Sequence, residues 1–561
     1  MSDAAFRRAF GEQFFDRLWQ LKPDWAIAIG YYKYADRLVV PDEAARAERL
    51  EQADRWLAEL RRIDPATLGP AVRADWAMLE NEFLAERWGL TELKSWQWDP
   101  SVYNVAEPFA LLLDLTFAPL DERLRLFGRR LERVPAYYAA AKASIENPSR
   151  EHTQLAIEQN RGALAVFGAE LEQALEMSGL DARERAQFNE RLSAARGAIE
   201  DYVRSLEALD ERLASGAVAA RSFRLGGDLY PQKFALEIQS GDTAEALYER
   251  ALAEKDVLHA RMRTLAEILW PKYFPNEAAP SGALDLIGRV IARLAEDHVA
   301  PAELLDEVKR QIPELERFVT EHGLVELDPS KPLIVRETPP HKRGIAGASI
   351  DAPGPYDAAA PTYYNVNPLD EEPPERAESW LREYNRWMLP VLNIHEAIPG
   401  HYVQLLHANR APSLIKSIFG NGAMIEGWAV YAERLMLESG YGEHRAEAWL
   451  VYSKWNLRSV CNTILDYGVH VLGMTEAEAL DLLTRQAFQS EAEAADKWRR
   501  VQRTNVQLTS YFSGYAAIVD LREQLKRERR GSFDLKRFHE QFLSYGSAPV
   551  RVIRELMLAE G

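Results

Sequence analysis

The sequence predicts a mostly α-helical protein with one small β-sheet. Apolar residues recur at steps of three and four through the first third of the chain, over roughly 43–62, 70–95, 119–147 and 151–178. This is the spacing of one face of a helix. A capping signal at Asp242-Thr243-Ala244-Glu245 opens a further helix. The longest stripe predicts one long helix and consists of Phe188, Leu192, Ala195, Ile199, Val203, Leu206, Leu209 and Leu213.

The chain of 561 residues is long enough for several average domains, although helical proteins of this length often form one body with two lobes. We expect an N-terminal helical lobe over 1–325 and a second lobe over 326–561, joined in one continuous fold. The second lobe contains the histidine and glutamate residues between 395 and 426 that predict the chemistry of this protein.

The helical spacing is interrupted in the middle of the chain. Leu333-Ile334-Val335-Arg336 predicts a short strand, and the glycines and prolines between 339 and 355 predict loops. A second strand is predicted at 361–368, between prolines that an edge strand tolerates. We expect Tyr364 and Asn365 to bind an extended peptide as an added strand, or the two strands to form a plain structural hairpin.

The strongest chemical signal is a His-Glu pair followed by a second histidine. His395 and Glu396 are adjacent, His401 follows, and Glu426 lies further along the chain. Two imidazoles and one carboxylate are ligands of a catalytic zinc site, which leaves one position for water. A glutamate beside the first histidine can take the proton of that water. The sequence therefore predicts one Zn²⁺ ion bound by His395, His401 and Glu426, with Glu396 as the catalytic base.

The spacing of the two histidines requires a break in the helix. His395 and His401 are six residues apart, roughly 240° around an unbroken helix, so they would point in different directions. Pro399 has no N–H for the carbonyl group of His395, and Gly400 can adopt dihedral angles that other residues avoid. We predict a bulge or break that returns His401 to the face of His395. His407 is an alternative ligand, but it lacks an adjacent glutamate and is interpreted as a surface or packing histidine.

Two acidic residues on the following helices are candidates for supporting roles around the metal ligands. Glu433 lies two turns after Glu426 on the same face, so it either orients a metal-bound histidine through the other ring N–H or pairs with an arginine. Asp466 and His470 are four residues apart, close enough to hydrogen-bond.

The motif His-Glu-x-x-Pro-Gly-His, followed by Glu-Gly-Trp-Ala-x-Tyr-Ala-Glu, resembles the bacterial family known as domain of unknown function 885. The N-terminal half matches in helical character and in its opening Phe-Phe-Asp-Arg-Leu-Trp region. A Pro-Gly-Gln run that usually precedes the family's tyrosine is replaced here by Asn505-Val506-Gln507. Further matches run in family order over about residues 360–555, at Arg458, Asp466-Tyr467-Gly468-Val469-His470, Ser510-Tyr511-Phe512-Ser513-Gly514, Phe538-His539 and Tyr545-Gly546-Ser547-Ala548-Pro549.

This family is similar in turn to neurolysin-like and carboxypeptidase Taq-like zinc peptidases. The resemblance implies a two-lobed, mostly helical body with the zinc ion deep in a channel. It implies that His470 faces the cleft, although a histidine satisfied within the helix packing is an equal alternative. It also implies that Tyr511 or Tyr515 donates a hydrogen bond to the oxyanion. Arg458 and Arg522 are candidates for the cation that holds the terminal carboxylate of a carboxypeptidase substrate.

Composition excludes several classes of partner. A net charge of −18 argues against nucleic acid, which requires clustered Lys and Arg, and against anionic membrane surfaces. Cys461 is the only cysteine, so neither an intrachain disulfide nor a cysteine-based metal site is expected. The N-terminus lacks the apolar core of a signal peptide, and no run of about eighteen apolar residues occurs. We expect a cytoplasmic protein, or a periplasmic one if an export signal is missing from this sequence.

The predicted function is that of a zinc-dependent metallopeptidase acting on short peptides, as an oligopeptidase or a carboxypeptidase. Hydrolysis of a non-peptide amide by the same residues is an alternative. A non-catalytic helical protein that binds peptides is another, although structural zinc sites favour four protein ligands, often cysteines. The sequence leaves the oligomeric state open.

Overall fold

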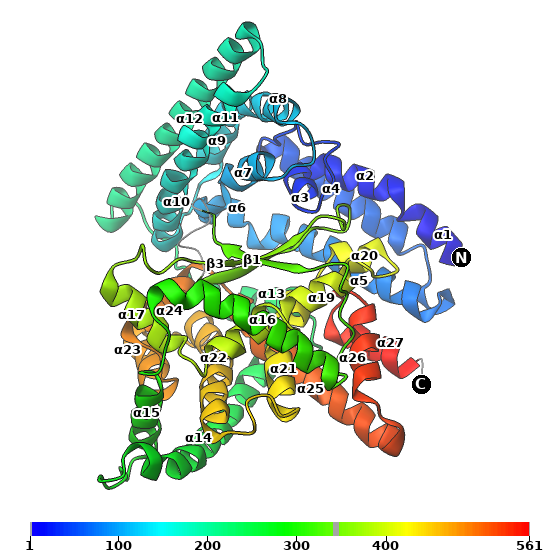
Figure 1. Ribbon diagram of the computed structural model, residues 1–561. Coiled ribbons are helices and arrows are strands. Elements are labelled where there is room, and N and C mark those ends of the chain that lie inside the picture. Colours follow the sequence, from blue (N-terminus) through cyan, green and yellow to red (C-terminus); the bar gives the residue numbers. More distant parts are fainter. Residues whose placement is uncertain (1–2, 340–346, 560–561) are drawn as a thin grey trace. The chain divides into compact units, whose positions relative to one another are not determined.

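The computed structural model describes residues 3–339 and 347–559, which form helices and one small sheet (Figure 1). The chain divides into two compact units. Unit 1 comprises Met1–Phe223 and Gly354–Ala358, and unit 2 comprises Arg224–Pro353 and Ala359–Gly561. The predicted class, mostly α with one small sheet, is confirmed. Across the described residues, no helix has both the length and the apolar composition that a bilayer crossing requires.

Unit 1 is built from helices. Short 3-10 or π turns occur at Pro65–Thr67, Gly89–Leu93, Pro100–Val102 and Leu164–Phe167. The helices are α1 (Asp3–Ala9), α2 (Glu12–Leu21), α3 (Pro23–Ala28), α4 (Glu43–Leu60), α5 (Pro70–Trp88), α6 (Ser95–Trp98), α7 (Ala106–Asp114), α8 (Leu120–Leu131), α9 (Val134–Ser144), α10 (Arg150–Ala163), α11 (Ala169–Met177) and α12 (Ala182–Ala214). Of these, α3 and α7 to α12 pack around a shared apolar core.

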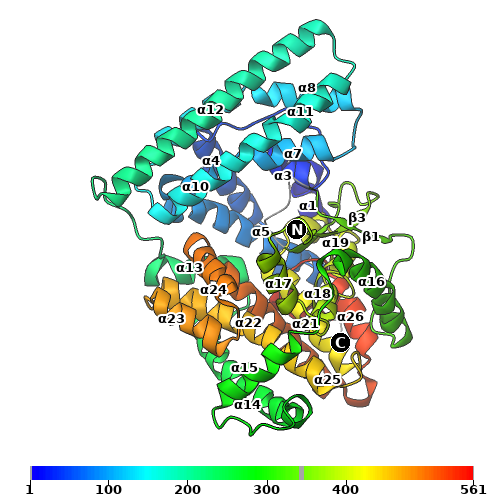
Figure 2. The same ribbon diagram turned by 60° about the vertical axis from the view of Figure 1, so that its left-hand side comes forward.

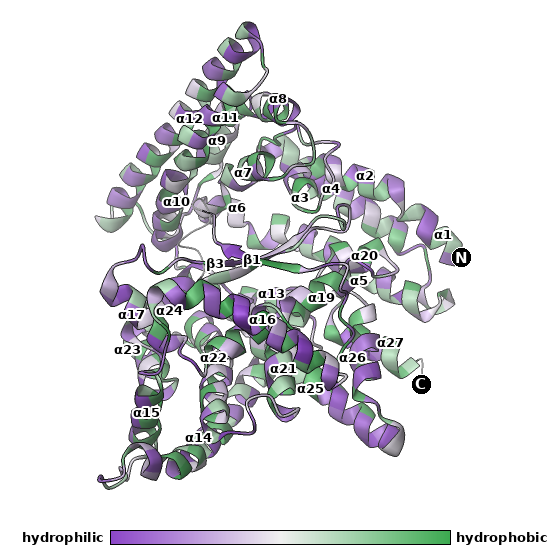
Figure 3. Cartoon of the chain, viewed as in Figure 1, coloured by the Kyte–Doolittle hydropathy of each residue, from purple (hydrophilic) through white to green (hydrophobic). Residues whose placement is uncertain are grey.

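The predicted apolar stripes correspond to these helices, with two interruptions. α4 and α5 form as expected, whereas the stripe at 119–147 is divided between α8 and α9 because Pro135 stands in the first turn of α9. The stripe at 151–178 is divided where Gly168 separates α10 from α11. The long helix is confirmed as α12, and Asp181 and Glu184 form a capping box at its start. Hydrophilic and hydrophobic residues alternate along α12, as expected for an amphipathic helix (Figure 3).

Unit 2 contains the sheet and the remaining helices. Short 3-10 or π turns occur at Pro301–Glu303, Leu482–Gln486, Gln507–Thr509 and Arg530–Ser532. The helices are α13 (Gly226–Ile238), α14 (Ala244–Tyr273), α15 (Ala283–Leu294), α16 (Leu304–Glu321), α17 (Pro374–Glu383), α18 (Leu389–Glu396), α19 (His401–Ala408), α20 (Leu414–Ile418), α21 (Gly422–Glu438), α22 (Ala446–His470), α23 (Glu476–Asp481), α24 (Glu491–Arg503), α25 (Ser510–Arg529), α26 (Leu535–Ser544) and α27 (Val550–Ala559).

The boundary between the units lies at Phe223, whereas we expected a division at residue 325. The difference comes from α13 to α16, which pack with the C-terminal half of the chain. α14 lies along α22 and α15, and α16 contacts α18 and the first strand of the sheet. These helices bury their apolar faces in the core of unit 2, which a local change in sequence pattern does not reveal.

The sheet has three strands, β1 (Leu333–Glu337), β2 (Ala348–Asp351) and β3 (Thr362–Val366), in the order β1-β3-β2. β3 pairs in parallel with β1 and antiparallel with β2, so that Tyr364 lies opposite both Val335 and Ile350. Both predicted strands are confirmed. The prediction that the second one is an edge strand is wrong, because β2 forms where loops were expected and covers its other side. Residues 340–346 of that predicted loop region lie outside the described residues.

Two glycines bring α21 and α25 into direct contact, and both helices contact α22 (Figure 2). A Cβ at Gly427 would overlap the backbone of Gly514, and a Cβ at Gly514 would overlap the carbonyl group of Ala423. Only glycine allows two helices to approach this closely. The contact fixes the position of Glu426, which precedes Gly427 on α21.

Candidate metal centre

The two histidines lie on separate helices that meet at a sharp bend. α18 ends at Glu396 and α19 begins at His401, with a cis peptide bond between Ile398 and Pro399. The N–H of Gly400 donates to the carbonyl of Ile394 at 3.0 Å. A Cβ at position 400 would overlap backbone oxygens of the preceding helix, so the bend requires glycine there. The predicted break between the histidines is confirmed.

A tryptophan from α21 holds this bend. The indole Nε1 of Trp428 donates to the carbonyl of Pro399 at 2.8 Å, and the Trp428 side chain is fully buried. The same helix supplies Glu426, two residues earlier. The backbone of the bend and the third candidate ligand are therefore positioned by one helix.

The three predicted ligands converge on one point. Nε2 of His395 lies 3.7 Å from Oε2 of Glu426, and Nε2 of His401 lies 3.5 Å from the same oxygen. All three donor atoms lie within 4.8 Å of one another. Two donors bound at about 2.1 Å to one tetrahedral ion are separated by about 3.4 Å. The spacing and the donor types therefore fit a single ion such as Zn²⁺.

The second nitrogen of His395 is held by a buried carboxylate. Nδ1 of His395 lies 2.6 Å from Oε1 of Glu433, which also accepts a hydrogen bond from Nε1 of Trp455 at 2.9 Å. The Glu433 side chain is 0% exposed. Of the two interpretations offered by the sequence, this geometry matches the carboxylate that orients a histidine ligand. His407 is not part of the cluster.

The charges of the site influence one another strongly. Burial would raise the pKa of the Glu426 carboxyl, but the imidazoles of His395 and His401 hold that pKa below its ordinary value. Burial would lower the pKa of His395, but hydrogen bonds to Glu426 and Glu433 outweigh it and raise the pKa. Burial raises the pKa of Glu396, against the opposing effect of the two histidines. A carboxyl group with a raised pKa is a better proton acceptor in catalysis.

A cavity of about 200 Å³ opens beside His395 and Glu396. Tyr511 and Arg458, two of the predicted site residues, also line it. Arg458 donates to Oε1 of Glu493 at 3.0 Å, and its guanidinium group lies over the ring of Trp455. The cavity therefore combines the predicted catalytic base, a phenol and a cation.

The two predicted peptide-binding residues of β3 face the interior. Tyr364 is fully buried, and its hydroxyl group donates to Oδ1 of Asn393 at 2.7 Å. The side chain of Asn365 accepts from Arg336 of β1 and donates to Asp351 of β2. The central strand of the sheet has no free edge, so this geometry does not support the prediction that Tyr364 and Asn365 bind an extended peptide as an added strand.

Tyr515 lies away from the cavity. Its hydroxyl group accepts a hydrogen bond from Nη1 of Arg434 at 2.9 Å, and its side chain is buried. Tyr511, four residues earlier, lines the cavity and lies 3.4 Å from Nη2 of Arg500. Of the two tyrosines, the geometry therefore leaves Tyr511 as the candidate oxyanion donor.

His470 and Asp466 belong to the packing of α22. Nε2 of His470 contacts the carbonyl oxygens of Val501 and Thr504, both at 2.9 Å, and His470 is 1% exposed. Asp466 accepts hydrogen bonds from the Tyr230 hydroxyl at 2.7 Å and from a backbone N–H of the same unit. Neither residue lines the cavity, so their predicted roles beside the metal centre are not supported by the geometry.

Sequence reasoning missed several residues of the cavity. Lys497 and Arg500 of α24 line it, as do Asn462 and Ser459 of α22. Lys497 and Arg500 are three residues apart and share a helix face, a signal visible in the sequence. The surrounding residues are also highly charged, as in an ordinary solvent-exposed helix, so the spacing of Lys497 and Arg500 does not stand out in the sequence.

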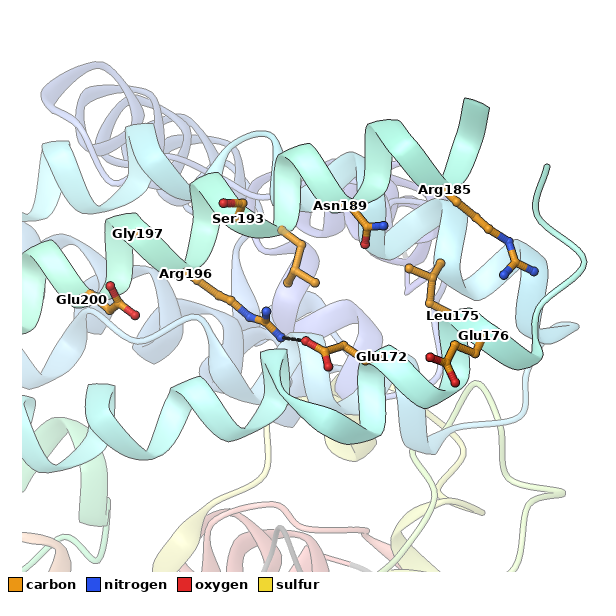
Figure 4. A pocket seen from close by; sticks show the side chains of 10 residues that line it. Glu172, Leu175, Glu176, Arg185, Asn189, Ser193, Arg196, Gly197 and Glu200 are labelled. Carbon is orange, nitrogen blue, oxygen red and sulfur yellow. Dashed lines mark hydrogen bonds and ion pairs between the residues drawn. The ribbon is translucent and has the colours of Figure 1, made fainter. Parts of the chain in front are cut away.

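A second hollow, of about 730 Å³, lies in unit 1 between α11 and α12 (Figure 4). Its polar side chains include an ion pair between Arg196 and Glu172 at 2.5 Å. Neither histidine nor cysteine lines it. It therefore offers no chemistry comparable with the cluster on α18, α19 and α21.

Fold and site together define a mostly helical protein with a candidate metal centre of two histidines and one glutamate. The chain belongs to the family described as bacterial protein of unknown function (DUF885), whose model matches residues 23–557. The resemblance inferred from the motifs is thus confirmed at the level of the family.

Two solved structures are similar to this chain. A candidate lipoprotein of unknown function from Shewanella oneidensis is 50% identical, with a TM-score of 0.89 and coverage of 100% of both chains. A candidate lipoprotein from Colwellia psychrerythraea is 18% identical, covers 100% of this chain and 98% of its own, and has a TM-score of 0.80, which shows a shared fold. A comparison with curated proteins gave no match.

Proposed function

We propose that this protein is a zinc-dependent metallopeptidase that hydrolyses short peptides. The observation that carries the proposal is the convergence of His395, His401 and Glu426, with Glu396 beside them in a cavity. A zinc ion at this position would supply a Lewis acid and lower the pKa of water to about 7. We include in this proposal that the family is similar to neurolysin-like and carboxypeptidase Taq-like zinc peptidases.

Glu396 is the proton carrier in the proposed reaction. Among the residues that the structure describes, no hydrogen bond or ion pair to its carboxylate is found, so the group is available to substrate. Glu396 takes a proton from water as the water oxygen bonds to the carbonyl carbon, and delivers it to the nitrogen as the C–N bond breaks. General acid–base catalysis of this kind contributes about 10²- to 10⁴-fold in rate.

Two further groups position the reacting atoms. Glu433 holds Nδ1 of His395, which leaves Nε2 directed at the metal position. Tyr511 lines the cavity, and in this proposal its hydroxyl group donates to the negative charge that develops on the carbonyl oxygen. Both roles depend on helices that the structure packs tightly together.

The edge of β2 is the place where an extended peptide would bind. β2 pairs with β3 on one side, contacts α18, and places Ala348 and the preceding Gly347 in the cavity wall. No strand among residues 3–339 and 347–559 pairs with the other edge of β2, and an unpaired edge supplies backbone donors and acceptors for an added strand. The strand-addition hypothesis therefore moves from β3 to β2.

Paired histidine variants test the metal centre. We expect His401→Gln to lower bound zinc from about one ion per chain to nearly none, because a ligand is lost. His407→Gln, on the same helix and outside the cluster, is the matched control and should retain the ion. Metal analysis after dialysis measures both. Equal zinc contents in the two variants would refute the site.

Glu396→Gln tests the chemistry. The variant should keep its zinc and lose nearly all cleavage of a peptide library read by mass spectrometry, because the proton carrier is gone. A zinc-loaded wild-type protein that cuts no peptide in the library would overturn the peptidase proposal. So would a Glu396→Gln variant of full activity.

The relatives also bear on where the protein works. We infer a place in the cell envelope, since the 50% identical structure is that of a candidate lipoprotein. This favours the periplasmic alternative over the cytoplasmic expectation. Fractionation of cells that express the natural gene is the test, and recovery of the protein in the cytoplasm alone would contradict the inference.

A further inference from the structure

One wall of the cavity beside His395 and Glu396 is formed by cations. Arg458 of α22 and Lys497 and Arg500 of α24 all line it. Lys497 and Arg500 are three residues apart and project from the same face of α24. The proposed metal-dependent cleavage assigns no role to these three side chains.

Lys497 is the most unusual of the three. It is 5% exposed, and the described part of the chain offers no hydrogen-bond acceptor or carboxylate bound to its ammonium group. Burial, with Arg458 and Arg500 nearby, lowers the pKa of Lys497 well below its ordinary value, and Glu493 offsets this in part. Buried lysines are normally paired, because an isolated buried charge is costly. Among the described residues, Lys497 therefore has no anionic partner.

The neighbouring carboxylates do not supply that anion. Glu493 is bound to Arg458. Glu383, a second acidic group near Arg458, is bound to Lys454 at 2.5 Å. The partners found for Arg500 are neutral, namely Oε1 of Gln507 at 2.7 Å and the Tyr511 hydroxyl group. Among the residues that the structure describes, Lys497 and Arg500 therefore have no carboxylate partner.

We infer that Arg458, Lys497 and Arg500 form a subsite for a carboxylate carried by the residue that leaves when the peptide bond is cut. The inference rests on the proposed peptidase function and specifies its substrate class. Guanidinium groups bind carboxylates through paired hydrogen bonds, and an ammonium group adds a third donor. The cavity of about 200 Å³ has room for one residue beyond the scissile bond.

The leaving residue keeps its carboxylate throughout the reaction. The amide C–N bond breaks, the water oxygen joins the carbonyl carbon, and the nitrogen of the leaving residue gains a proton. The carboxylate is either the free α-carboxylate of a peptide C-terminus, which defines a carboxypeptidase or dipeptidase, or an acidic side chain. Both sources present the same chemistry to the three cations.

Binding to a catalytically inactive protein tests the subsite directly. Zinc-loaded Glu396→Gln protein is titrated with N-acetyl-alanyl-alanine and with its α-amide. We expect the acid to bind about tenfold more tightly or better, because its charge is matched by the cations. A second pair, the α-amides of N-acetyl-alanyl-glutamate and N-acetyl-alanyl-glutamine, tests a side-chain carboxylate. A preference in either pair supports the subsite and identifies its source, and equal binding within both pairs overturns it.

Variants locate the effect. Lys497→Met and Arg500→Gln, each in the Glu396→Gln background, should weaken binding of the preferred carboxylate about tenfold and leave its uncharged counterpart unchanged. Arg499→Gln, an exposed neighbour on α24, is the matched control and should change neither. Because Arg500 is also exposed, its variant reports even if Lys497→Met fails to fold. A preference that survives in the folded variants contradicts the inference.

Cleavage by the wild-type protein separates this inference from the proposed function. Zinc-dependent cutting that is equally fast for acids and amides, with or without acidic side chains, retains the peptidase and overturns the carboxylate subsite. A binding preference for carboxylates without any cutting retains the subsite and overturns the peptidase.

Discussion

Nδ1 of His395 lies 2.6 Å from Oε1 of Glu433, a carboxylate with no exposed surface. The contact fixes the orientation of the His395 ring, so that Nδ1 faces Glu433 and Nε2 faces the metal position.

Replacement of Glu433 by glutamine should weaken zinc binding by about 10- to 100-fold, because the hydrogen bond that orients the His395 ring becomes weaker and uncharged. Competition with a chromogenic chelator measures the affinity. Trp455→Phe removes the other donor to Glu433 while keeping an aromatic ring in place, and should have a smaller effect. An affinity equal to that of the wild type in Glu433→Gln would show that the carboxylate plays no part in holding the ligand.

Gly400→Ala should destabilise unit 2 by about 2 kcal/mol or more, because the added Cβ overlaps backbone oxygens of Ile394 and His395. Urea denaturation gives the change in the free energy of unfolding. Gly162→Ala in α10 is the control, since nothing lies within 4 Å of its added Cβ, and should stabilise by about 0.5–1 kcal/mol. A tolerated alanine at 400 would mean that the bend can relax.

Tyr511→Phe should lower kcat by about 10²-fold with little change in KM, because the lost donor acts on charge that develops in the transition state. Tyr515→Phe should leave kcat close to that of the wild type, since the hydroxyl group of Tyr515 is bound to Arg434 outside the cavity. Steady-state kinetics on one peptide separate the two. A larger loss of kcat in Tyr515→Phe would reverse this assignment.

Stability should fall in acid partly through His539. Burial lowers the pKa of His539 from 6.5 to about 4, and its Nδ1 contacts the carbonyl of Leu324 while its Nε2 contacts the Tyr431 hydroxyl. Arg522 lowers this pKa further, and Asp534 opposes the shift. Between pH 6.5 and 4 the imidazole of His539 is therefore protonated in the unfolded chain and neutral in the folded chain. The contribution of His539 to the free energy of unfolding is complete above pH 6.5 and is lost as the pH falls towards 4.

The loss attributable to His539 is about 3 kcal/mol over this range. Urea midpoints at several pH values measure it, and the comparison with His539→Gln cancels the titration of the carboxylates. We expect the variant to be less stable at pH 7 but to lose less stability on acidification. Parallel pH profiles would exclude His539 as the source.

Much of the fold and the metal cluster could be predicted because they follow local rules. The stripe from Phe188 to Leu213 has helical period, and the helix formed. The six-residue spacing of His395 and His401 called for a break, and Pro399 and Gly400 stood where it had to occur. In each case neighbouring residues carry the information.

The failures concern long-range pairing and burial. β2 has the sequence Ala-Ser-Ile-Asp, which has little local preference for a strand. It forms because its backbone hydrogen-bonds to the edge of β3. Tyr511 and Tyr515 are four residues apart and look equivalent in the sequence, yet Arg434 of another helix holds only the second. Lys497 lies in a highly charged helix, and nothing local marks its burial.

The glycine contact between α21 and α25 has a consequence for how this protein can evolve. Glu426 and Tyr511 are carried by the two helices that touch at Gly427 and Gly514, so the gap between carboxylate and phenol is set by bare backbone. Any side chain introduced at Gly427 or Gly514 would force the two helices apart and increase the distance between Glu426 and Tyr511. A mutation at either glycine would therefore disturb the proposed site even though Glu426 and Tyr511 are still present in the sequence.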